Sequence, residues 1–312
     1  MKWKKLGLIF DLTKNKPSWL KSHAMTPTPL PMHDRIRVYY TGRNLQGESV
    51  ISYVDFDKQD PTIIIYVHDK PILEIGGMGM FDDCGTICTC AINENDKVYL
   101  YYTAYSISHK VPYKNAIGLA VSTDGGNTFK RMFDGPILDR SKYEPFFVIS
   151  PWVIKDNDRW HMWYASATKW ILLNNKPESV YHIKYAKSND GLNWDRDNIS
   201  CIYPHNEEEA NARPTVIKED GKFKMWFTYR GSKDFRDGPE SYRIGYADAD
   251  LNNPEKWTRD DSKSGIDIGI NEYDSLMQAY PSVVKVGDKK LLYYNGNGFG
   301  VNGFCLAISN DC

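Results

Sequence analysis

Carboxylic acids recur at one position of a repeated pattern in this chain. Five alternating runs end in an aromatic residue, and in four of them an acid lies 20 residues before that aromatic. Paired carboxylates can act as general acid and base. The alternative is that these side chains cap turns, or that the loops are simply acidic. The acids at this position are Asp82, Glu144, Glu207 and Asp274, with Leu20 at the same position in the first run.

Arginines form a second group with possible chemistry. Arg43 and Arg230 each lie three residues after a closing aromatic, and Arg213 precedes a proline at the start of a predicted strand. A guanidinium group offers a planar pair of donors to a carboxylate or phosphate. We therefore expect an anion site if these three side chains converge, although they could instead pair with the acids. Asn297 occupies the position equivalent to Arg43 and Arg230 in the last run.

A repeat of about 60 residues must position these side chains. The closing aromatics are separated by 62, 62, 63 and 67 residues, and a proline precedes four of them by 13 residues. Each run predicts a hairpin of a short strand, a polar turn and an alternating strand, and further strand and turn signals follow it. The closing aromatics are Tyr40, Tyr102, Tyr164, Phe227 and Tyr294.

This pattern predicts an all-β fold, a five-bladed β-propeller with four-stranded antiparallel blades. The last run stops before its fourth strand, so we expect residues 2–10 to close the last blade and residues 1–312 to form one domain. The loops that enter the innermost strands should then meet at one mouth of the central channel. His23 and Tyr280 would join the acids and arginines there, and Trp152 would either stack on a ligand or pack in the core.

Composition excludes several classes of protein. The chain has 39 basic and 40 acidic residues, a formal net charge of -1, and no apolar stretch of membrane-spanning length. We expect no nucleic-acid or membrane partner, no secretion signal and therefore a cytoplasmic location. No ligand spacing predicts a metal or another cofactor, and the six cysteines should be reduced.

The repeat resembles the five-bladed glycoside hydrolase superfamily, which includes families 32, 43, 62, 68 and 130. The likeness rests on inner strands such as RPTV (213–216) and on blade tails such as STDGGNTF (122–129), and it covers essentially the whole chain. The resemblance implies a carbohydrate site at the channel mouth. It also implies acids from different blades that act on a glycosidic bond as general acid and as base or nucleophile.

The chain departs from these families at one position. A catalytic acid often directly precedes the inner-strand proline there, whereas this chain has Thr26, Cys88, Ser150, Arg213 and Tyr280 at the equivalent positions. We therefore expect catalysis, if it occurs, from loop acids, with Asp83 as one carboxylate and Glu209 or Asp274 as its partner. The predicted binding residues are His23, Arg43, Asp82, Glu144, Trp152, Arg213, Arg230, Tyr280 and Asn297.

The expected function is hydrolysis, phosphorolysis or transfer at a glycosidic bond. The arginines favour an anionic carbohydrate or sugar-phosphate ligand, in glycan metabolism or in the synthesis of a surface polysaccharide. The missing acids leave a second possibility, a propeller that binds a sugar or a protein without catalysis. A third is a sialidase, because 122–129 also fits the Asp-box; six blades would then be expected, and the repeat predicts five.

Overall fold

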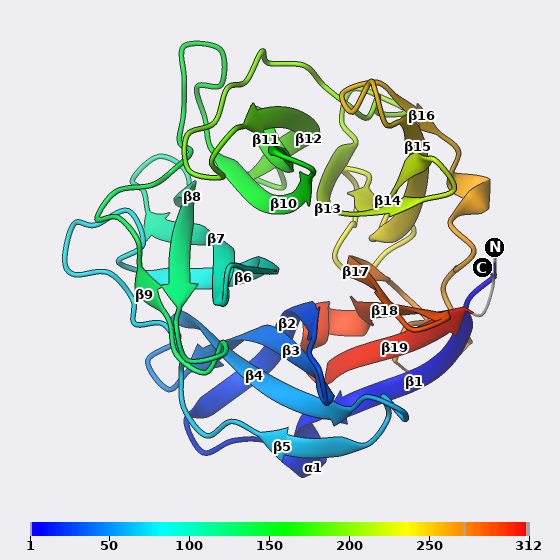
Figure 1. Ribbon diagram of the computed structural model, residues 1–312. Helices are drawn as coiled ribbons and strands as arrows, with labels where there is room; N and C mark the ends of the chain where they lie inside the picture. Colours follow the sequence, from blue (N-terminus) through cyan, green and yellow to red (C-terminus); the bar gives the residue numbers. More distant parts are fainter. Residues whose placement is uncertain (1, 271–272, 310–312) are drawn as a thin grey trace.

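The strands form five groups, which we number 1 to 5 in chain order. The computed structural model describes residues 2–270 and 273–309. Nearly all regular structure is β, which confirms the all-β prediction, and the helices are short: α1 (Leu12–Asn15), η1 (Asp261–Lys263) and η2 (Asn297–Gly300). Figure 1 shows the groups placed around a central region, with both chain ends beside group 5.

Groups 1 and 2 belong to one hydrogen-bonded sheet, but a single parallel pairing of Ser49 with Gly85 joins them. Group 1 contains β2 (Leu20–Pro31), β3 (Arg35–Asn44), β4 (Ser49–Asp57) and β5 (Ile64–Val67). Group 2 contains β6 (Gly85–Glu94), β7 (Lys97–Ile107), β8 (Tyr113–Ser122) and β9 (Lys130–Arg131).

Groups 3, 4 and 5 are separate sheets. Group 3 contains β10 (Val148–Asp156), β11 (Arg159–Leu173) and β12 (Lys176–Ser188). Group 4 contains β13 (Ala210–Glu219), β14 (Lys222–Arg230), β15 (Arg243–Asp250) and β16 (Trp257–Arg259). Group 5 contains β17 (Ala279–Val286), β18 (Lys289–Asn295), β19 (Gly303–Ser309) and β1 (Lys4–Asp11).

Strand β1 pairs antiparallel with β19 and so completes group 5, which is the pairing predicted for residues 2–10. The prediction of four strands in every group is wrong for group 3. There the fourth strand is reduced to two isolated bridges, Lys184 with Ser200 and Lys187 with Asp195.

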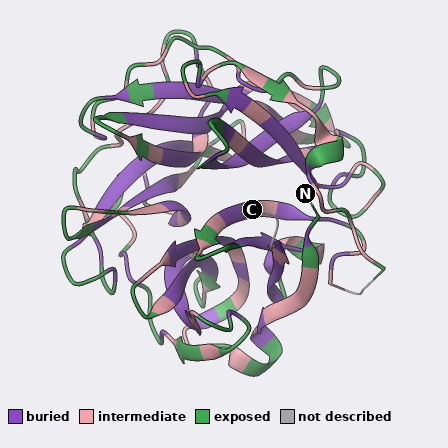
Figure 2. Cartoon of the chain, turned by 45° about the vertical axis from the view of Figure 1, so that its right-hand side comes forward, coloured by how far each residue is buried: buried purple, intermediate pink, exposed green. Residues whose placement is uncertain are grey.

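The innermost strands contact one another in cyclic order. Strand β2 packs beside β6, β6 beside β10, β10 beside β13, β13 beside β17, and β17 again beside β2. Residues from all five strands line one mostly apolar cavity of about 310 Å³. The buried faces of the sheets lie between the groups, and exposed residues concentrate in the turns and loops (Figure 2).

Each inner strand has an irregularity at the repeated proline position, where four groups have a proline, which lacks an N–H to continue the ladder, and group 2 has Thr89. The pairing register shifts there in all five groups. Four of the residues before this position have positive φ, an arrangement that costs energy for side chains with a Cβ. They are Thr26 (52°), Ser150 (54°), Arg213 (51°) and Tyr280 (57°). We call the five residues that directly precede the proline position the bulge residues. They are these four and Cys88.

Hydrogen bonds link neighbouring groups at the bulge residues. In four of the five steps, the bulge residue donates its backbone N–H to a side chain one position after the closing aromatic of the preceding group. The bonds run from Cys88 to Thr41 (2.9 Å), Ser150 to Thr103 (2.8 Å), Tyr280 to Thr228 (2.8 Å) and Thr26 to Asn295 (2.8 Å). The last bond joins group 5 to group 1. The exception is Arg213, because the equivalent residue in group 3 is Ala165, which has no side-chain acceptor.

Candidate functional site at the channel mouth

The loop acids lie near the end of the channel where the inner strands begin, and most are held in buried ion pairs. Asp82 accepts a hydrogen bond from the closing aromatic Tyr102 (3.0 Å) and pairs with Arg131 (2.7 Å). Its side chain is fully buried. Because Arg131 lies on the outermost strand of the same group, the acid ties the loop to both the second and the last strand.

The same three-part arrangement recurs in groups 3 and 5. Glu144 accepts from Tyr164 (3.0 Å) and pairs with Arg196 (2.8 Å). Asp274 accepts from Tyr294 (3.0 Å) and pairs with Lys5 of β1 (2.7 Å). These carboxylates are at most 3% exposed, so partners within the protein account for their burial.

Groups 1 and 4 each lack one part of this arrangement of acid, tyrosine and basic residue. In group 4 the closing aromatic is Phe227, which has no hydroxyl, and Glu209 rather than the exposed Glu207 pairs with Arg259 (2.6 Å). In group 1 Leu20 replaces the acid, and the buried hydroxyl of Tyr40 has no partner among the described residues. The regular spacing of the acids therefore reflects a repeated structural lock.

Asp83 differs from these acids. It is half-buried, accepts from the backbone N–H of Gly79 (3.1 Å) and the thiol of Cys84 (3.3 Å), and has no ion pair within the part of the chain that the structure describes. Asp83, Glu209 and Asp274 lie on loops of groups 2, 4 and 5, and no hydrogen bond joins any two of them among the described residues. The catalytic role of these three acids therefore stays a prediction.

Two buried arginines, Arg213 and Arg230, belong to this part of the fold. Arg213 is fully buried and crosses from group 4 to three other groups: it donates to Thr28 Oγ1 (2.9 Å), to Ser282 Oγ (3.5 Å) and to the Thr89 carbonyl. All of these partners are neutral. Burial lowers the pKa of Arg213 to about 10, which reflects the cost of a charge in this position.

Arg230 is the second buried guanidinium, at 2% exposure. It donates to the carbonyls of Ser179 (2.7 Å) and Gly231 (2.8 Å), and its charge lies 3.8 Å from the centre of the Phe235 ring. Neither Arg213 nor Arg230 forms an ion pair within residues 2–270 and 273–309. The Nε atom of each is buried without a hydrogen-bond partner there.

The charges of both guanidinium groups act on the phenol of Tyr280. Burial and the nearby phenols of Tyr181 and Tyr113 raise the pKa of Tyr280, whereas the charges of Arg230 and Arg213 lower it. The phenol therefore lies within electrostatic reach of both arginines. No hydrogen bond of its hydroxyl is found in the described part of the chain.

Aromatic rings surround this charged centre on two sides. On one side Tyr113 packs against Trp170 (5.4 Å between ring centres) and Phe147 (5.6 Å). On the other, Tyr242 and Phe299 are in edge-to-face contact at 5.1 Å, and Tyr280 lies 6.3 Å from each. Such flat apolar faces with a few polar groups are typical of small-ligand sites.

Arg43 and His23 form a separate part of the rim. Arg43 is exposed and has no ion pair among the described residues. The pKa of His23 is lowered mainly by the burial of His23 and, to a smaller extent, by the charge of Arg43. His23 contacts Ser22 Oγ through Nδ1 (2.8 Å). No hydrogen bond joins Arg43 to Arg213 or Arg230 in the described structure, and the convergence of the three arginines stays a prediction.

Two other predicted binding residues have structural partners. Trp152 lies beyond the bulge residues, lines the 310 Å³ cavity and donates its indole N–H to the Val216 carbonyl (2.9 Å). The side-chain oxygen of Asn297 accepts from the backbone N–H groups of Leu276 (2.9 Å) and Met277 (3.2 Å), which fixes the loop before β17.

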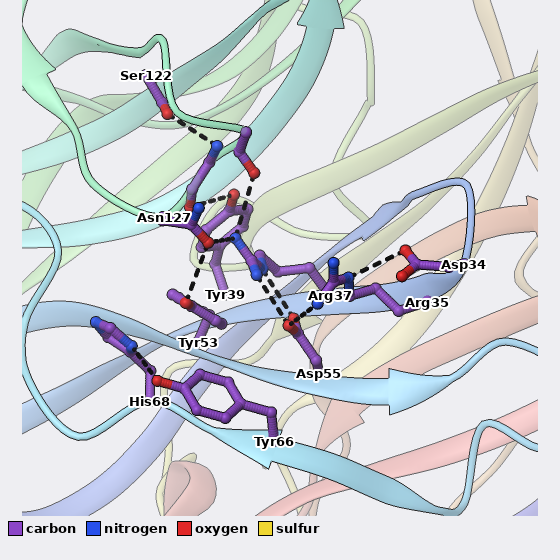
Figure 3. A network of polar contacts seen from close by, with 12 residues as sticks. Asp34, Arg35, Arg37, Tyr39, Tyr53, Asp55, Tyr66, His68, Ser122 and Asn127 are labelled. Carbon is purple, nitrogen blue, oxygen red and sulfur yellow. Dashed lines mark hydrogen bonds and ion pairs between the residues drawn. The ribbon is translucent and has the colours of Figure 1, made fainter.

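The Asp-box lies at the opposite end of the strands and is a packing device. Burial alone would raise the pKa of Asp124, but hydrogen bonds from Ser122 and Thr128 lower it to about 2. Arg37 of group 1 donates to Asn127 of this turn (2.8 Å) and pairs with Asp55 (2.8 Å), so the turn joins groups 1 and 2 (Figure 3).

Metal-binding and membrane-spanning features are absent from the described residues. No cluster of three or more His, Cys, Asp or Glu side chains suited to a metal occurs in that part of the chain. No helix among those residues is long and apolar enough to span a membrane. The five described cysteines form no disulfide, and Cys312 lies outside the described residues.

Several solved structures with the same fold are described as glycoside hydrolases. A structure described as "Glycoside hydrolase" matches with a TM-score of 0.77 at 15% identity, over 99% of this chain and 92% of its own. A complex of BT0996 with RGII matches with a TM-score of 0.75 at 15% identity, over 98% and 91%. A thermostable family-43 glycoside hydrolase matches with a TM-score of 0.65 at 17% identity, over 93% and 91%.

Sequence relatives cover the whole chain. No family model matches it. Two Mycobacterium tuberculosis proteins, "Uncharacterized protein MT1551" of strain CDC 1551 and "Uncharacterized protein Rv1502" of strain H37Rv, are each 34% identical over 310 residues, which is 99% of both chains. The chain therefore belongs to the family of these two mycobacterial proteins, and it shares its fold with solved glycoside hydrolases.

Proposed function

We propose that this chain is a five-bladed β-propeller that binds an anionic carbohydrate at the mouth of its channel. The five strand groups are the blades, and the cyclic contacts of the inner strands and the bond from Thr26 to Asn295 support ring closure. The glycoside hydrolase fold of its structural neighbours supports a carbohydrate ligand.

The observation that carries the proposal is the pair of buried guanidinium groups at the mouth. Arg213 and Arg230 are 0% and 2% exposed, and no carboxylate of the described residues neutralises either. A buried charge without a counter-ion is costly, and a carboxylate or phosphate of a ligand would remove that cost. We infer that the acidic group of the sugar lies against Arg230 and the hydroxyl of Tyr280, while the sugar ring packs on the surrounding aromatic faces.

The locked loop acids favour binding over cleavage. Hydrolysis of a glycosidic bond normally uses two carboxyl groups that face each other across the substrate. Glu209 and Asp274 are already engaged with Arg259 and Lys5. Arg43 and His23 would contact the part of the ligand that extends from the mouth.

Calorimetric titration tests the proposal. We expect galacturonate to bind at least tenfold more tightly than galactose, and Arg230→Gln to remove most of that preference. Tyr280→Phe, which removes only one hydroxyl, should reduce the preference for galacturonate less. It replaces Arg230→Gln as the test variant if Arg230→Gln does not fold. Arg35→Gln, at the far end of β3 beside Asp34 and Asp55, is the control and should bind like the wild type. Equal affinities for the two sugars, or full preference retained in both mouth variants, would refute the proposal.

A hydrolase remains the second candidate, because Asp83 alone among the predicted catalytic acids has no ion pair in the described structure. In that case Asp83→Asn would abolish turnover of aryl glycosides while leaving galacturonate affinity nearly unchanged. If no turnover depends on Asp83, binding without catalysis is the one candidate function that remains.

A further inference from the structure

A polar cavity lies between groups 4 and 5. It has a volume of about 570 Å³ and is lined by the N-terminal residues Trp3 and Lys5, by Arg243 at the start of β15, and by Asp267 and Gln278. The backbone N–H of Gln278 donates to the carbonyl of Tyr242 (3.0 Å). Because Tyr242 is one of the rings at the mouth, the two sites are neighbours with separate linings.

Arg243 is held so that one edge of its guanidinium group is left for a ligand. Its Nη1 atom donates to the carbonyls of Ser241 (3.2 Å), Tyr242 (3.0 Å) and Leu276 (2.9 Å). Its Nη2 and Nε atoms have no hydrogen-bond partner among the described residues. These two atoms form the edge that binds both oxygens of a carboxylate or phosphate.

Gln278 provides a buried acceptor in the same cavity. Its side chain is 0% exposed, and its Nε2 atom donates to the Asp267 carbonyl (2.9 Å) and to Asp274 Oδ2 (2.8 Å). These two acceptors fix the orientation of the amide. The Oε1 atom has no donor in the described part of the chain, and a buried oxygen without a donor is unfavourable. A ligand hydroxyl would satisfy it.

We propose that this cavity is a second carbohydrate-binding site, which takes a phosphorylated or carboxylated monosaccharide. The acidic group binds the free edge of Arg243, and a sugar hydroxyl donates to Gln278 Oε1. Lys5, 23% exposed and paired with Asp274, adds positive charge to the wall. Because Trp3 and Lys5 come from the N-terminal segment that completes group 5, ligand binding stabilises the closed fold and raises the melting temperature.

Two charge variants test the site in opposite directions, with glucose 6-phosphate as the probe and glucose as the neutral control. Arg243→Met should weaken calorimetric binding of the phosphate at least tenfold and abolish the rise in melting temperature that it causes. Asp267→Asn removes a negative charge from the wall at an exposed position, and should tighten binding several-fold. A gain of affinity cannot arise from misfolding. Unchanged affinity in both variants, or equal binding of glucose, would overturn the proposal.

The two proposed sites can fail independently. If both exist, the wild-type protein binds two equivalents of glucose 6-phosphate, and Arg230→Gln and Arg243→Met each remove one. If only the cavity binds, the wild type takes up one equivalent, which Arg243→Met abolishes and Arg230→Gln does not. If one equivalent binds and is abolished by Arg230→Gln but not by Arg243→Met, the mouth site exists and the cavity site does not.

Discussion

The loop carboxylates and the two buried arginines of this protein are in opposite electrostatic situations. Asp82, Glu144 and Asp274 each have a tyrosine and a basic residue as partners. Arg213 and Arg230 have only neutral partners among the described residues. The acids occupy a repeated position and have a repeated role, whereas at the positions of Arg213 and Arg230 the residue type varies from one repeat to the next. Departure from the repeat is therefore the better guide to ligand binding in this fold.

The largest expected effect is on stability and comes from breaking a loop lock. Asp82→Asn leaves the partly buried Arg131 without its counter-ion, and should lower the free energy of unfolding by about 3 kcal/mol. Urea denaturation monitored by tryptophan fluorescence measures this loss. The neighbouring Asp83→Asn is the matched control and should change the free energy of unfolding by less than about 0.5 kcal/mol. Equal losses in the two variants would contradict the assignment of Asp82 to a structural lock.

A smaller loss is expected where a bond between neighbouring groups is removed. Thr228→Val has nearly the same shape but cannot accept the N–H of Tyr280, so it should cost about 1–2 kcal/mol of unfolding free energy. Thr258→Val, at an exposed position on β16, should cost almost nothing in the same urea titration. If Thr228→Val were as stable as Thr258→Val, the hydrogen bonds at the bulge residues would not hold neighbouring groups together.

The smallest effect is pH-dependent and lies far from the mouth. The pKa of Asp124 is about 2 in the folded protein and 3.8 ordinarily. Its ionised form therefore stabilises the fold fully at pH values above the pKa of the unfolded chain. This contribution is lost as the pH falls through about 2. Because the side chain is exposed, Asp124→Asn should cost only about 1 kcal/mol at pH 7.

The difference between Asp124→Asn and the wild type should vanish near pH 2, and galacturonate affinity at neutral pH should not change. Thermal unfolding across this pH range checks the first point and calorimetry the second. A stability difference that persisted at pH 2 would show that the charge of Asp124 is not what stabilises the Asp-box turn.

Much of the fold follows from local patterns in the sequence. The closing aromatics and prolines recur at one period, and all lie where expected, on the second and inner strands of the five groups. Pairing of the N-terminal strand with β19 follows from the strand missing after the last repeat. The reduced fourth strand of group 3 does not, because the segment after β12 retains its tryptophan but forms only isolated bridges.

The site is less predictable, because its contacts join residues that are remote in the chain. The position of Asp82 is regular, but its partner Arg131 is 49 residues away, and only the folded group shows that they meet. Glu209 replaces Glu207 because the loop in group 4 places the buried acid two residues later. No sequence motif marks Tyr113, Tyr181, Tyr242 or Gln278. The one signal of the mouth in the sequence is the absence of an acid before the inner-strand proline, where Arg213 and Tyr280 occur.

A crystal structure of the protein with galacturonic acid tests the central claim most directly. We expect the sugar at the channel mouth, with its carboxylate within hydrogen-bond distance of Arg230 and of the Tyr280 hydroxyl, and with the Asp82–Arg131 and Glu144–Arg196 pairs intact. A sugar bound instead between the loop acids, with those ion pairs opened and Arg230 out of reach, would contradict it.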